Sequence, residues 1–370
     1  GNYKAALAEH KLFILYRDSL SNEETQKETL QSAMQYEYDK KEAISKAEQE
    51  KKDAIVQAEE HKQKIIIWAV LGGLLIVVVF AGFVVRSLRV TNRQKGIIEK
   101  QKHLVEEHQK EIIDSINYAE RIQRSFIATK EILDENLTQT LSKGDAVAQD
   151  YFVFFKPKDI VSGDFYWASK LNNGNFALAT ADSTGHGVPG AIMSLLNITS
   201  LEKAIETHTQ PADILNATRK TIIERLKKDG STEGGKDGMD AILTVYDFKN
   251  NKLIIAAANN PVWIVRGTET IELKPDKMPV GKHDKQANSF TQQEIALQSG
   301  DVIYTLTDGF PDQFGGEKGK KFMSKNLREL LSANAHLPMQ GQKELLEVTF
   351  KNWAGNLEQV DDVTIIGVRV

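Results

Sequence analysis

Four aspartates lie in short polar turns beside apolar runs. Asp164 lies in the segment SGDFYW and Asp182 in ADSTGHGVPGA, while Asp308 lies in TDGF and Asp361 opens DDVT. Carboxylate oxygens are hard ligands, which suit Mg²⁺ or Mn²⁺ better than zinc or copper. A single Asp-Gly after a strand is most often a turn residue. Four acidic turns, with no Lys or Arg inside the first two segments, favour a shared site for divalent cations.

The first two aspartates need a hairpin to bring them together. The segment NNGN at residues 172–175 is typical of a hairpin turn, because Asn and Gly tolerate positive φ. The following segment, FALATAD, alternates with the period of a strand. We therefore expect Asp164 and Asp182 to share one site. A helix is predicted to follow, because Pro189 suits a first helical turn.

The sequence around these turns predicts a layered α+β domain. Strand-like runs lie at 147–155, 165–171, 176–182, 241–247, 253–258, 262–266, 302–307 and 363–370. Helical runs lie at 189–207, 211–228, 325–332 and 341–353. The segments KNNK at 249–252 and RGT at 266–268 are typical of hairpin connections, so the sheets are expected to be mainly antiparallel. Mixed antiparallel strands and helices favour an α+β fold over a doubly wound one.

Taken in order, the four acidic segments resemble those of the SpoIIE-type branch of metal-dependent Ser/Thr protein phosphatases, within the type 2C superfamily. The resemblance covers residues 110–370, and the segment YAERIQ at 118–123 is similar to the helical lead-in before such domains. It implies an αββα sandwich, in which helices flank two antiparallel β-sheets and a two-metal site lies at one sheet edge. It also implies hydrolysis of phosphoserine or phosphothreonine.

The resemblance also implies a role for each acidic residue. Asp182 matches the ligand that bridges two metal ions, and Ser183 would add its backbone carbonyl. Asp308 and Asp361 match the other metal-binding carboxylates, and Asp164 matches the acidic residue of the first segment. The implied cofactors are two Mn²⁺ or Mg²⁺ ions about 4 Å apart, which activate a water for in-line attack on phosphorus.

Other residues near these segments are expected to have smaller roles. Asp362 is expected to orient Asp361. His186 is a candidate general acid, but local packing or hydrogen bonding at the helix start is favoured. Asp240 resembles a position near the metals. The segment ANNP at 258–261 departs from the family's Gly-His-Pro-like pattern, and the first acidic segment lacks the phosphate-binding arginine of eukaryotic relatives, so metal is expected to hold most of the substrate phosphate.

The composition limits the architecture. A chain of 370 residues predicts two or three units. The formal net charge of -4 gives no reason to propose nucleic acid as a partner. The absence of cysteine excludes disulfides, thiolate catalysis and cysteine-ligated zinc.

Residues 1–64 are predicted to be helical and to form an extracytoplasmic sensor or stalk. The segment SNEE at 21–24 has the pattern of a capping box, which predicts the start of a second helix there. The opening GNYKAA resembles the second helix of a tetratricopeptide-type repeat, so a remnant of such an array is one interpretation. A solvated spacer helix is the other.

Residues 65–85 are predicted to form one transmembrane helix. These 21 uncharged, mostly apolar residues would span roughly 31 Å as a helix, close to the hydrocarbon thickness of a bilayer. A buried core helix is the alternative. Basic residues are slightly denser after the segment than before it, which favours the cytoplasm for the C-terminal side.

Residues 86–127 are predicted to be a coiled-coil signalling linker. Apolar residues recur in sevens, at Ile98, Val105, Ile112, Ala119 and Phe126. A seven-residue repeat needs a partner helix to cover its seam, so a homodimer is expected. Two histidines on this helix, at 103 and 108, are phospho-acceptor candidates for a sensor histidine kinase, but solvated histidines are the simpler interpretation.

The favoured interpretation is a membrane-anchored dimeric phosphatase of the bacterial inner membrane, with a cytoplasmic phosphatase domain at residues 145–370. By resemblance, its partner would be a phosphorylated regulatory protein of the anti-sigma-factor antagonist type. Control through the register of the coiled coil is a further hypothesis. One alternative is a catalytically silent phosphatase fold that acts as a binding module, which the four intact aspartates disfavour. The other is the histidine kinase, but no nucleotide-binding segments follow the linker.

Overall fold

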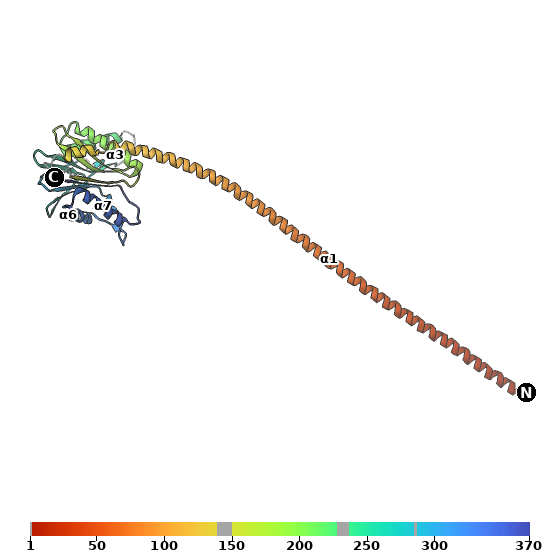
Figure 1. The fold of residues 1–370 in the computed structure, drawn as a ribbon. Helices are drawn as coiled ribbons and strands as arrows, with labels where there is room; N and C mark the ends of the chain where they lie inside the picture. Colours follow the sequence, from red (N-terminus) through yellow and green to blue (C-terminus); the bar gives the residue numbers. More distant parts are fainter. Residues whose placement is uncertain (1, 139–149, 228–236, 285–286) are drawn as a thin grey trace. The chain divides into compact units, whose positions relative to one another are not determined.

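The computed structural model describes residues 2–138, 150–227, 237–284 and 287–370 (Figure 1). The chain divides into two compact units, Gly1–Leu104 and Val105–Val370, which are described separately. Helix α1, at Tyr3–Arg124, forms the first unit and enters the second. In the first unit nearly every side chain is exposed.

Helix α1 passes through the predicted capping box without a break, so the prediction of a second helix starting at residue 21 is wrong. Thr25 Oγ1 instead donates a hydrogen bond to the Ser21 carbonyl oxygen at 2.6 Å, within a continuous helix. No Gly or Pro precedes Ser21 inside the helix, so the backbone N–H groups there already have partners in the turn before. A capping side chain therefore has no free N–H group to satisfy.

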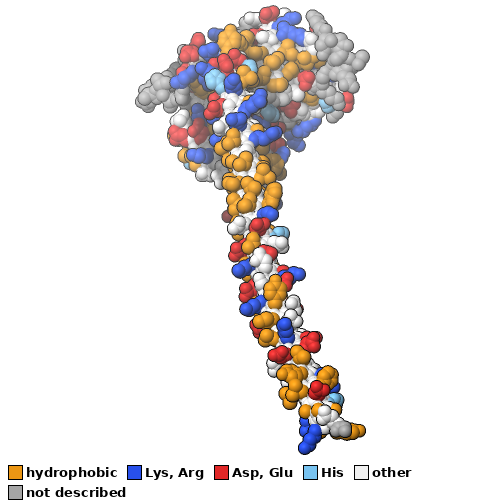
Figure 2. All heavy atoms as spheres, turned by 90° about the vertical axis from the view of Figure 1, so that its right-hand side faces the viewer, with side chains coloured by type: hydrophobic (Ala, Val, Ile, Leu, Met, Phe, Trp, Pro, Cys, Tyr) orange, Lys and Arg blue, Asp and Glu red, His pale blue; other side chains and the backbone are white. Residues whose placement is uncertain are grey.

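Helix α1 also contains the apolar stretch at 65–85, and by length and composition it is a candidate membrane span. All side chains of this stretch are exposed in the described chain. Figure 2 shows hydrophobic side chains gathered there, whereas charged side chains are frequent toward the N-terminus. The stretch thus presents apolar surface on all its faces.

Two antiparallel sheets form the centre of the second unit. The first has the strand order β1-β13-β10-β6-β7, and the second has β2-β3-β4-β5-β9, with β8 paired to β4. The strands are β1 Tyr151–Lys156, β2 Asp164–Lys170, β3 Phe176–Ser183, β4 Gly238–Asp247, β5 Lys252–Ala257, β6 Val262–Arg266, β7 Glu269–Leu273, β8 Val280–Gly281, β9 Gln293–Ala296, β10 Val302–Leu306 and β13 Val363–Arg369. A separate small hairpin pairs β11 Phe314–Gly315 with β12 Lys320–Lys321.

Helices cover the outer faces of both sheets. Beyond α1, the helices of this unit are α2 Lys130–Leu133, the π-helix η1 Asp134–Thr138, α3 Gly187–Ile205, α4 Pro211–Leu226, α5 Gly309–Asp312, α6 Ser324–Asn334 and α7 Met339–Ala354. Of these, α2 and η1 instead contribute Leu133 and Leu137 to the core between the sheets. Helices α3 and α4 pack on the second sheet, and α7 packs on the first (Figure 1). One apolar core lies between the sheets and one under each helical layer. This is the predicted αββα sandwich.

The strand predictions agree with the structure except at the sheet edges. All eight predicted runs contain strands, although residues 147–149 of the first run lie outside the described residues. Strands β7 and β9 were missed because both are short edge strands in which at least half of the side chains are polar. Edge strands have only one neighbour to pack against, so their apolar pattern is less pronounced. The two-residue strands β8, β11 and β12 were also missed, since they are too short to show a pattern.

The packed unit includes residues that precede 145. Ile127, Leu133 and Leu137 are buried in its cores. Phe126, the last residue of the predicted heptad series, lies two residues beyond the end of α1 and packs against the core beneath α3 and α4. Phe126 is therefore used inside the globular unit and is not available to cover a coiled-coil seam.

Candidate metal centre

Three aspartates lie side by side at one end of the second sheet. Asp182 in β3 is directly opposite Asp164 of β2 on one flank and Asp240 of β4 on the other. Directly opposed residues of antiparallel strands have Cβ atoms about 4.5–5.5 Å apart. The hairpin thus brings Asp164 and Asp182 together, as predicted. It also adds Asp240, which was expected to lie near the metals only by resemblance.

The loops at this end pack so closely that only glycine fits. A Cβ on Gly163 or on Gly190 would overlap the carbonyl oxygen of Gly185. The start of β2, the turn after β3 and the first turn of α3 therefore touch through their backbones. Gly185 itself has a φ of +88°, a conformation that residues with a Cβ rarely adopt.

Two further aspartates come from the first sheet, in which β10 and β13 are neighbours. Asp308 follows β10 at the N-terminus of α5, and Asp361 precedes β13. A Cβ on Gly309 would overlap the carbonyl oxygen of Asp362, so the two turns are in contact. Asp308 and Asp361 both raise the pKa of Asp182 by charge repulsion, which shows that they lie beside the row of three.

The five carboxylates repel one another. Burial first, and then the other four carboxylates, raise the pKa of Asp182 to about 10. Burial and then the Asp312 carboxylate raise the pKa of Asp308 to about 6, and because this residue is exposed overall, solvent screening moderates its energetic effect. Burial also raises the pKa of Asp240. Uncompensated negative charge at this depth favours either protons or bound cations.

Asp164 lies at the inner end of the row and joins the two sheets. Its side chain is buried, and its Oδ2 accepts hydrogen bonds from Thr307 Oγ1 at 2.7 Å and Thr364 Oγ1 at 2.8 Å. Burial raises the pKa of this carboxyl well above its ordinary value, and the two hydroxyl donors oppose that rise. Asp164 therefore has a structural role in addition to any role as a ligand.

Asp362 holds the loop that leads into the site. Its buried carboxylate accepts the backbone N–H of Lys158 at Oδ1 and that of Gly163 at Oδ2, each at 2.7 Å. Its own backbone N–H donates to Asp361 Oδ1 at 2.9 Å. The expected orientation of Asp361 by its neighbour is thus present, through the main chain of Asp362.

Gln123 holds the same loop from the other side, and sequence reasoning missed it. This buried side chain, in the last turn of α1, donates from Nε2 to the Ser162 carbonyl oxygen at 2.5 Å and to Ser194 Oγ at 2.8 Å. Its Oε1 accepts the Ser162 backbone N–H at 3.1 Å. The segment before Asp164 is therefore linked both to α1 and to α3.

A cavity of about 220 Å³ opens over the acidic row. It is lined by Asp182, Ser183, Thr184, Gly185, His186, Met239, Asp240, Pro279 and Asp361. His186 Nδ1 lies 3.1 Å from Asp159 Oδ2, a local interaction at the helix start, as predicted. Asn259 has more than a turn role, because its Nδ2 donates to Asp240 Oδ1 at 2.7 Å.

The donor chemistry of this cavity fits hard divalent cations. Its ligating groups are carboxylate and backbone carbonyl oxygens, and repulsion among the carboxylates is relieved by positive charge. Among the described residues, no three His, Asp or Glu side chains converge closely enough to enclose one ion. Water or substrate oxygens would therefore complete the coordination of any bound ion, as is usual for Mg²⁺.

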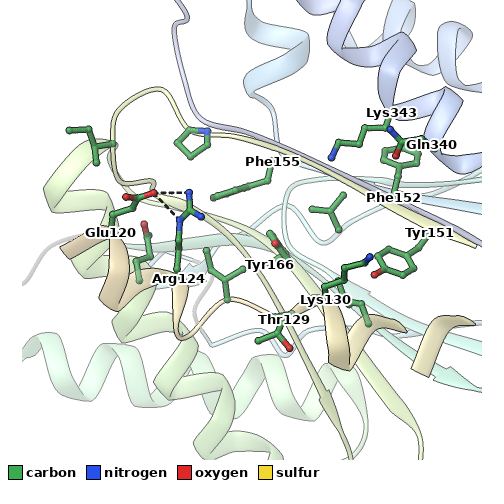
Figure 3. A pocket seen from close by; sticks show the side chains of 17 residues that line it. Glu120, Arg124, Thr129, Lys130, Tyr151, Phe152, Phe155, Tyr166, Gln340 and Lys343 are labelled. Atoms are coloured by element: carbon green, nitrogen blue, oxygen red, sulfur yellow. Dashed lines mark hydrogen bonds and ion pairs between the residues drawn. The ribbon is translucent and has the colours of Figure 1, made fainter. Parts of the chain in front are cut away.

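A larger cavity of the second unit lies elsewhere. It measures about 620 Å³ and is bordered by the last turn of α1, by α2 and by strands β1 and β2. Figure 3 shows Glu120 and Arg124 paired at one end and Lys130 and Lys343 on other walls. None of the five aspartates lines it. Its size therefore does not make it the chemical site.

Comparisons with known proteins agree with this geometry. The profile of the family described as Stage II sporulation protein E (SpoIIE) matches residues 172–370. The solved SiaA-PP2C domain of Pseudomonas aeruginosa is 31% identical, and the match covers 71% of this chain and 98% of that domain with a TM-score of 0.61.

Two further proteins are similar to this chain. One is the solved PP2C phosphatase domain of SpoIIE from Bacillus subtilis, with a fragment of its regulatory domain, which is 18% identical. The match covers 60% of this chain and 63% of that chain, with a TM-score of 0.50. At this identity it supports the fold alone. Protein IcfG from Synechocystis is 28% identical over 295 residues, which is 69% of this chain and 45% of that protein. The chain thus spans less than half the length of that curated relative.

Proposed function

Because the chain belongs to the SpoIIE family and carries a PP2C-type serine/threonine phosphatase domain, we propose that it hydrolyses phosphoserine or phosphothreonine on a regulatory protein. The observation that carries this proposal is the convergence of five carboxylates from two sheets, three of which, Asp182, Asp240 and Asp361, line one cavity. A silent binding module has no need to maintain such repulsion. The resemblance of the acidic segments suggests a substrate of the anti-sigma-factor antagonist type.

Each carboxylate has its own role in this proposal. Asp182, at the centre of the row, would hold divalent cations together with Asp308, Asp361 and the Ser183 carbonyl. Asp164 completes the set from the inner end. When bound, two Mn²⁺ or Mg²⁺ ions supply an activated water and charge stabilisation at the phosphoryl group.

The remaining task of the protein is to hold these carboxylates still. Asp362 fixes the loop before Asp164 through two backbone N–H groups, and Gln123 fixes Ser162 in the same loop. Close positioning of reacting groups is a major source of rate enhancement. In the absence of a cysteine, hydrolysis would proceed by direct attack of water, without a thiol intermediate.

We also propose that the whole protein is anchored in a bacterial inner membrane and acts as a homodimer. The exposed apolar stretch at 65–85 supports a single span, with the phosphatase domain in the cytoplasm. The exposed heptad residues Ile98, Val105 and Ile112 support a coiled-coil dimer of the linker, through which the membrane-side signal would act. Cross-linking of single cysteines introduced at Ile98 and Ile112 tests the dimer, since both pairs are expected to form disulfides under oxidation.

The test of the activity is hydrolysis of p-nitrophenyl phosphate by the full chain in detergent, with and without Mn²⁺. We expect Mn²⁺-dependent turnover that falls by about 10³-fold or more in Asp182→Asn and in Asp308→Asn, because each change removes a ligand charge. Asp213→Asn, an exposed residue of α4, is the matched control and should retain activity. Absence of both turnover and calorimetric Mn²⁺ binding in the unchanged protein would instead identify a silent binding module.

A further inference from the structure

The proposed substrate is an anion, but the cavity that would receive it is acidic. Its lining includes Asp182, Asp240 and Asp361 and contains no Lys or Arg among the described residues. A phosphate monoester carries about 1.5 to 2 negative charges near pH 7. Cations bound to the carboxylates are partly neutralised by them. A positively charged side chain at the rim would therefore strengthen substrate binding.

We propose that Lys158 is this side chain and binds the substrate phosphate, with His186 as the residue that positions its ammonium group. This inference rests on the proposed phosphatase function. His186 lines the cavity, and its Nε2 lies 3.4 Å from Lys158 Nζ. The Lys158 ammonium is thus next to the cavity wall, on the side where the turn after Asp182 leads into α3.

The hydrogen-bond pattern assigns the proton of the imidazole. An ammonium group can only donate, and a carboxylate can only accept. His186 lies between the two, with Nε2 toward Lys158 and Nδ1 toward Asp159 Oδ2 at 3.1 Å. The neutral ring with its proton on Nδ1 satisfies both contacts. In this state His186 orients Lys158 and has no proton to give at Nε2, so it does not act as the general acid.

The backbone of Lys158 is also fixed relative to the metal centre. Its N–H donates to Asp362 Oδ1 at 2.7 Å, and Asp362 adjoins the candidate ligand Asp361. A Cβ on Gly187 would lie 3.0 Å from Asp159 Oδ2, so the first residue of α3 lies close to the segment that carries Lys158. A side chain held at both ends loses less entropy on binding a ligand, which favours affinity.

Two other lysines near the acidic row are less suited to this role. Lys321 Nζ is paired with Asp312 Oδ2 at 2.7 Å. Lys277 Nζ lies 3.4 Å from the Asn259 carbonyl oxygen and acts on the Asp240 carboxylate. The direct partner of Lys158 is an imidazole, which carries no negative charge, so that partner does not cancel the charge of the ammonium. Lys158 would then serve where the first acidic segment lacks an arginine.

The test compares lysine variants of the full chain in Mg²⁺ or Mn²⁺ buffer. Lys158→Met keeps most of the aliphatic stem and removes the charge. We expect it to raise KM for p-nitrophenyl phosphate and the inhibition constant of inorganic phosphate by about tenfold, the worth of one charge-assisted hydrogen bond. The kcat should change by less than about threefold, because ground-state and transition-state phosphate lose the same contact. Lys158→Arg should restore most of the affinity.

His186→Ala separates positioning from acid catalysis. If His186 acts through Lys158, the variant raises KM by about threefold, and it adds nothing further when Lys158 is already Met. A general acid would behave differently, since its loss lowers kcat and its effect combines with that of the lysine. Lys321→Met and Lys277→Met are the matched controls and should each shift KM by less than about twofold.

Several outcomes would overturn the proposal. An unchanged KM and phosphate inhibition constant in Lys158→Met is one, and a larger effect in Lys277→Met or Lys321→Met is another. If the unchanged protein has no turnover, the proposed function fails, and calorimetric titration with inorganic phosphate in Mg²⁺ decides the role of Lys158 separately. Phosphate binding that Lys158→Met weakens would support it, whereas unweakened binding, or none in the unchanged protein, would count against it.

Discussion

Asp362 and Asp182 both lie beside Asp164, but their carboxylates have opposite kinds of surroundings. Asp362 is 2% exposed and receives two backbone N–H groups at 2.7 Å. No described residue donates a hydrogen bond to the Asp182 carboxylate, and its surroundings are other carboxylates. A buried charge without partners is costly, so a protein retains one only where something else compensates it. Carboxylates that accept hydrogen bonds, such as Asp362, therefore hold the backbone around the site in place. Carboxylates without hydrogen-bond donors, such as Asp182, are available to bind cations.

The largest effect on stability is expected from the hydrogen-bonded side. Asp362→Ala leaves the N–H groups of Lys158 and Gly163 buried without acceptors, at a cost of about 3 kcal/mol in the free energy of unfolding. Denaturant unfolding followed by tryptophan fluorescence measures this cost. Turnover should fall as well, because the loop before Asp164 is released. An Asp362→Ala protein as stable as the parent would show that these two hydrogen bonds do not hold the loop.

The second largest loss of stability is expected at Gln123, which also holds the loop before Asp164. Gln123→Leu keeps the side-chain volume but removes three hydrogen bonds to Ser162 and Ser194. We expect a loss of about 2 kcal/mol in unfolding free energy, since Ser162 keeps buried polar atoms without partners. Gln57→Leu, at an exposed position of the same helix outside the heptad segment, is the matched control. Equal stability of the Gln123 and Gln57 variants would show that the Gln123 hydrogen bonds do not hold the loop.

The candidate cation ligands of the site are easier to predict from the sequence than the residues that hold the site in place by hydrogen bonds. Asp182, Asp308 and Asp361 stand out because each lies in a polar turn beside an apolar run, and NNGN predicts the hairpin that pairs Asp164 with Asp182. Gln123 contacts residues 39 and 71 positions away, so no local pattern marks it. On the helix it is one polar residue among many. Asp240 was expected to be near the metals only by resemblance, because its neighbour Asp182 lies across the sheet and no local pattern links the two.

Substitution of Asp182 is expected to raise the free energy of unfolding of the metal-free protein, by less than the losses expected above. The unfolded carboxyl has a pKa of about 3.9, whereas the folded pKa values of Asp182 and Asp308 are raised to about 10 and about 6. Above about pH 4 the folded protein holds protons that the unfolded chain has released, so metal-free stability falls as pH rises. Asp182→Asn has no such proton to lose. In EDTA at pH 8 it should be more stable than the parent, by about 1 to 2 kcal/mol.

Metal should reverse this order. With Mn²⁺ the parent gains binding energy that Asp182→Asn cannot gain fully, so the parent should become the more stable protein. Unfolding at pH 5 and pH 8, with EDTA or with Mn²⁺, gives all the comparisons needed. If Asp182→Asn is the less stable protein at pH 8 in EDTA, the Asp182 carboxylate has stabilising partners and the contrast with Asp362 fails.

The smallest change in unfolding free energy is expected from the contact of Asp240. This residue is intermediate between Asp362 and Asp182, because it belongs to the acidic row and still accepts one hydrogen bond. Asn259→Ala removes that bond, which joins Asn259 Nδ2 to Asp240 Oδ1 at 2.7 Å. At a half-buried position the loss of this hydrogen bond should lower the unfolding free energy by about 0.5 to 1 kcal/mol.

The effect of Asn259→Ala on Mn²⁺ affinity should be larger in relative terms, because an unrestrained Asp240 can turn away from the cavity. Calorimetric titration of Asn259→Ala with Mn²⁺ measures this, and Asn250→Ala, in the exposed turn before β5, is the control. A variant that binds Mn²⁺ as tightly as the control would mean that Asp240 needs no hydrogen bond to stay in the row, and that packing between β3 and β5 alone holds it there.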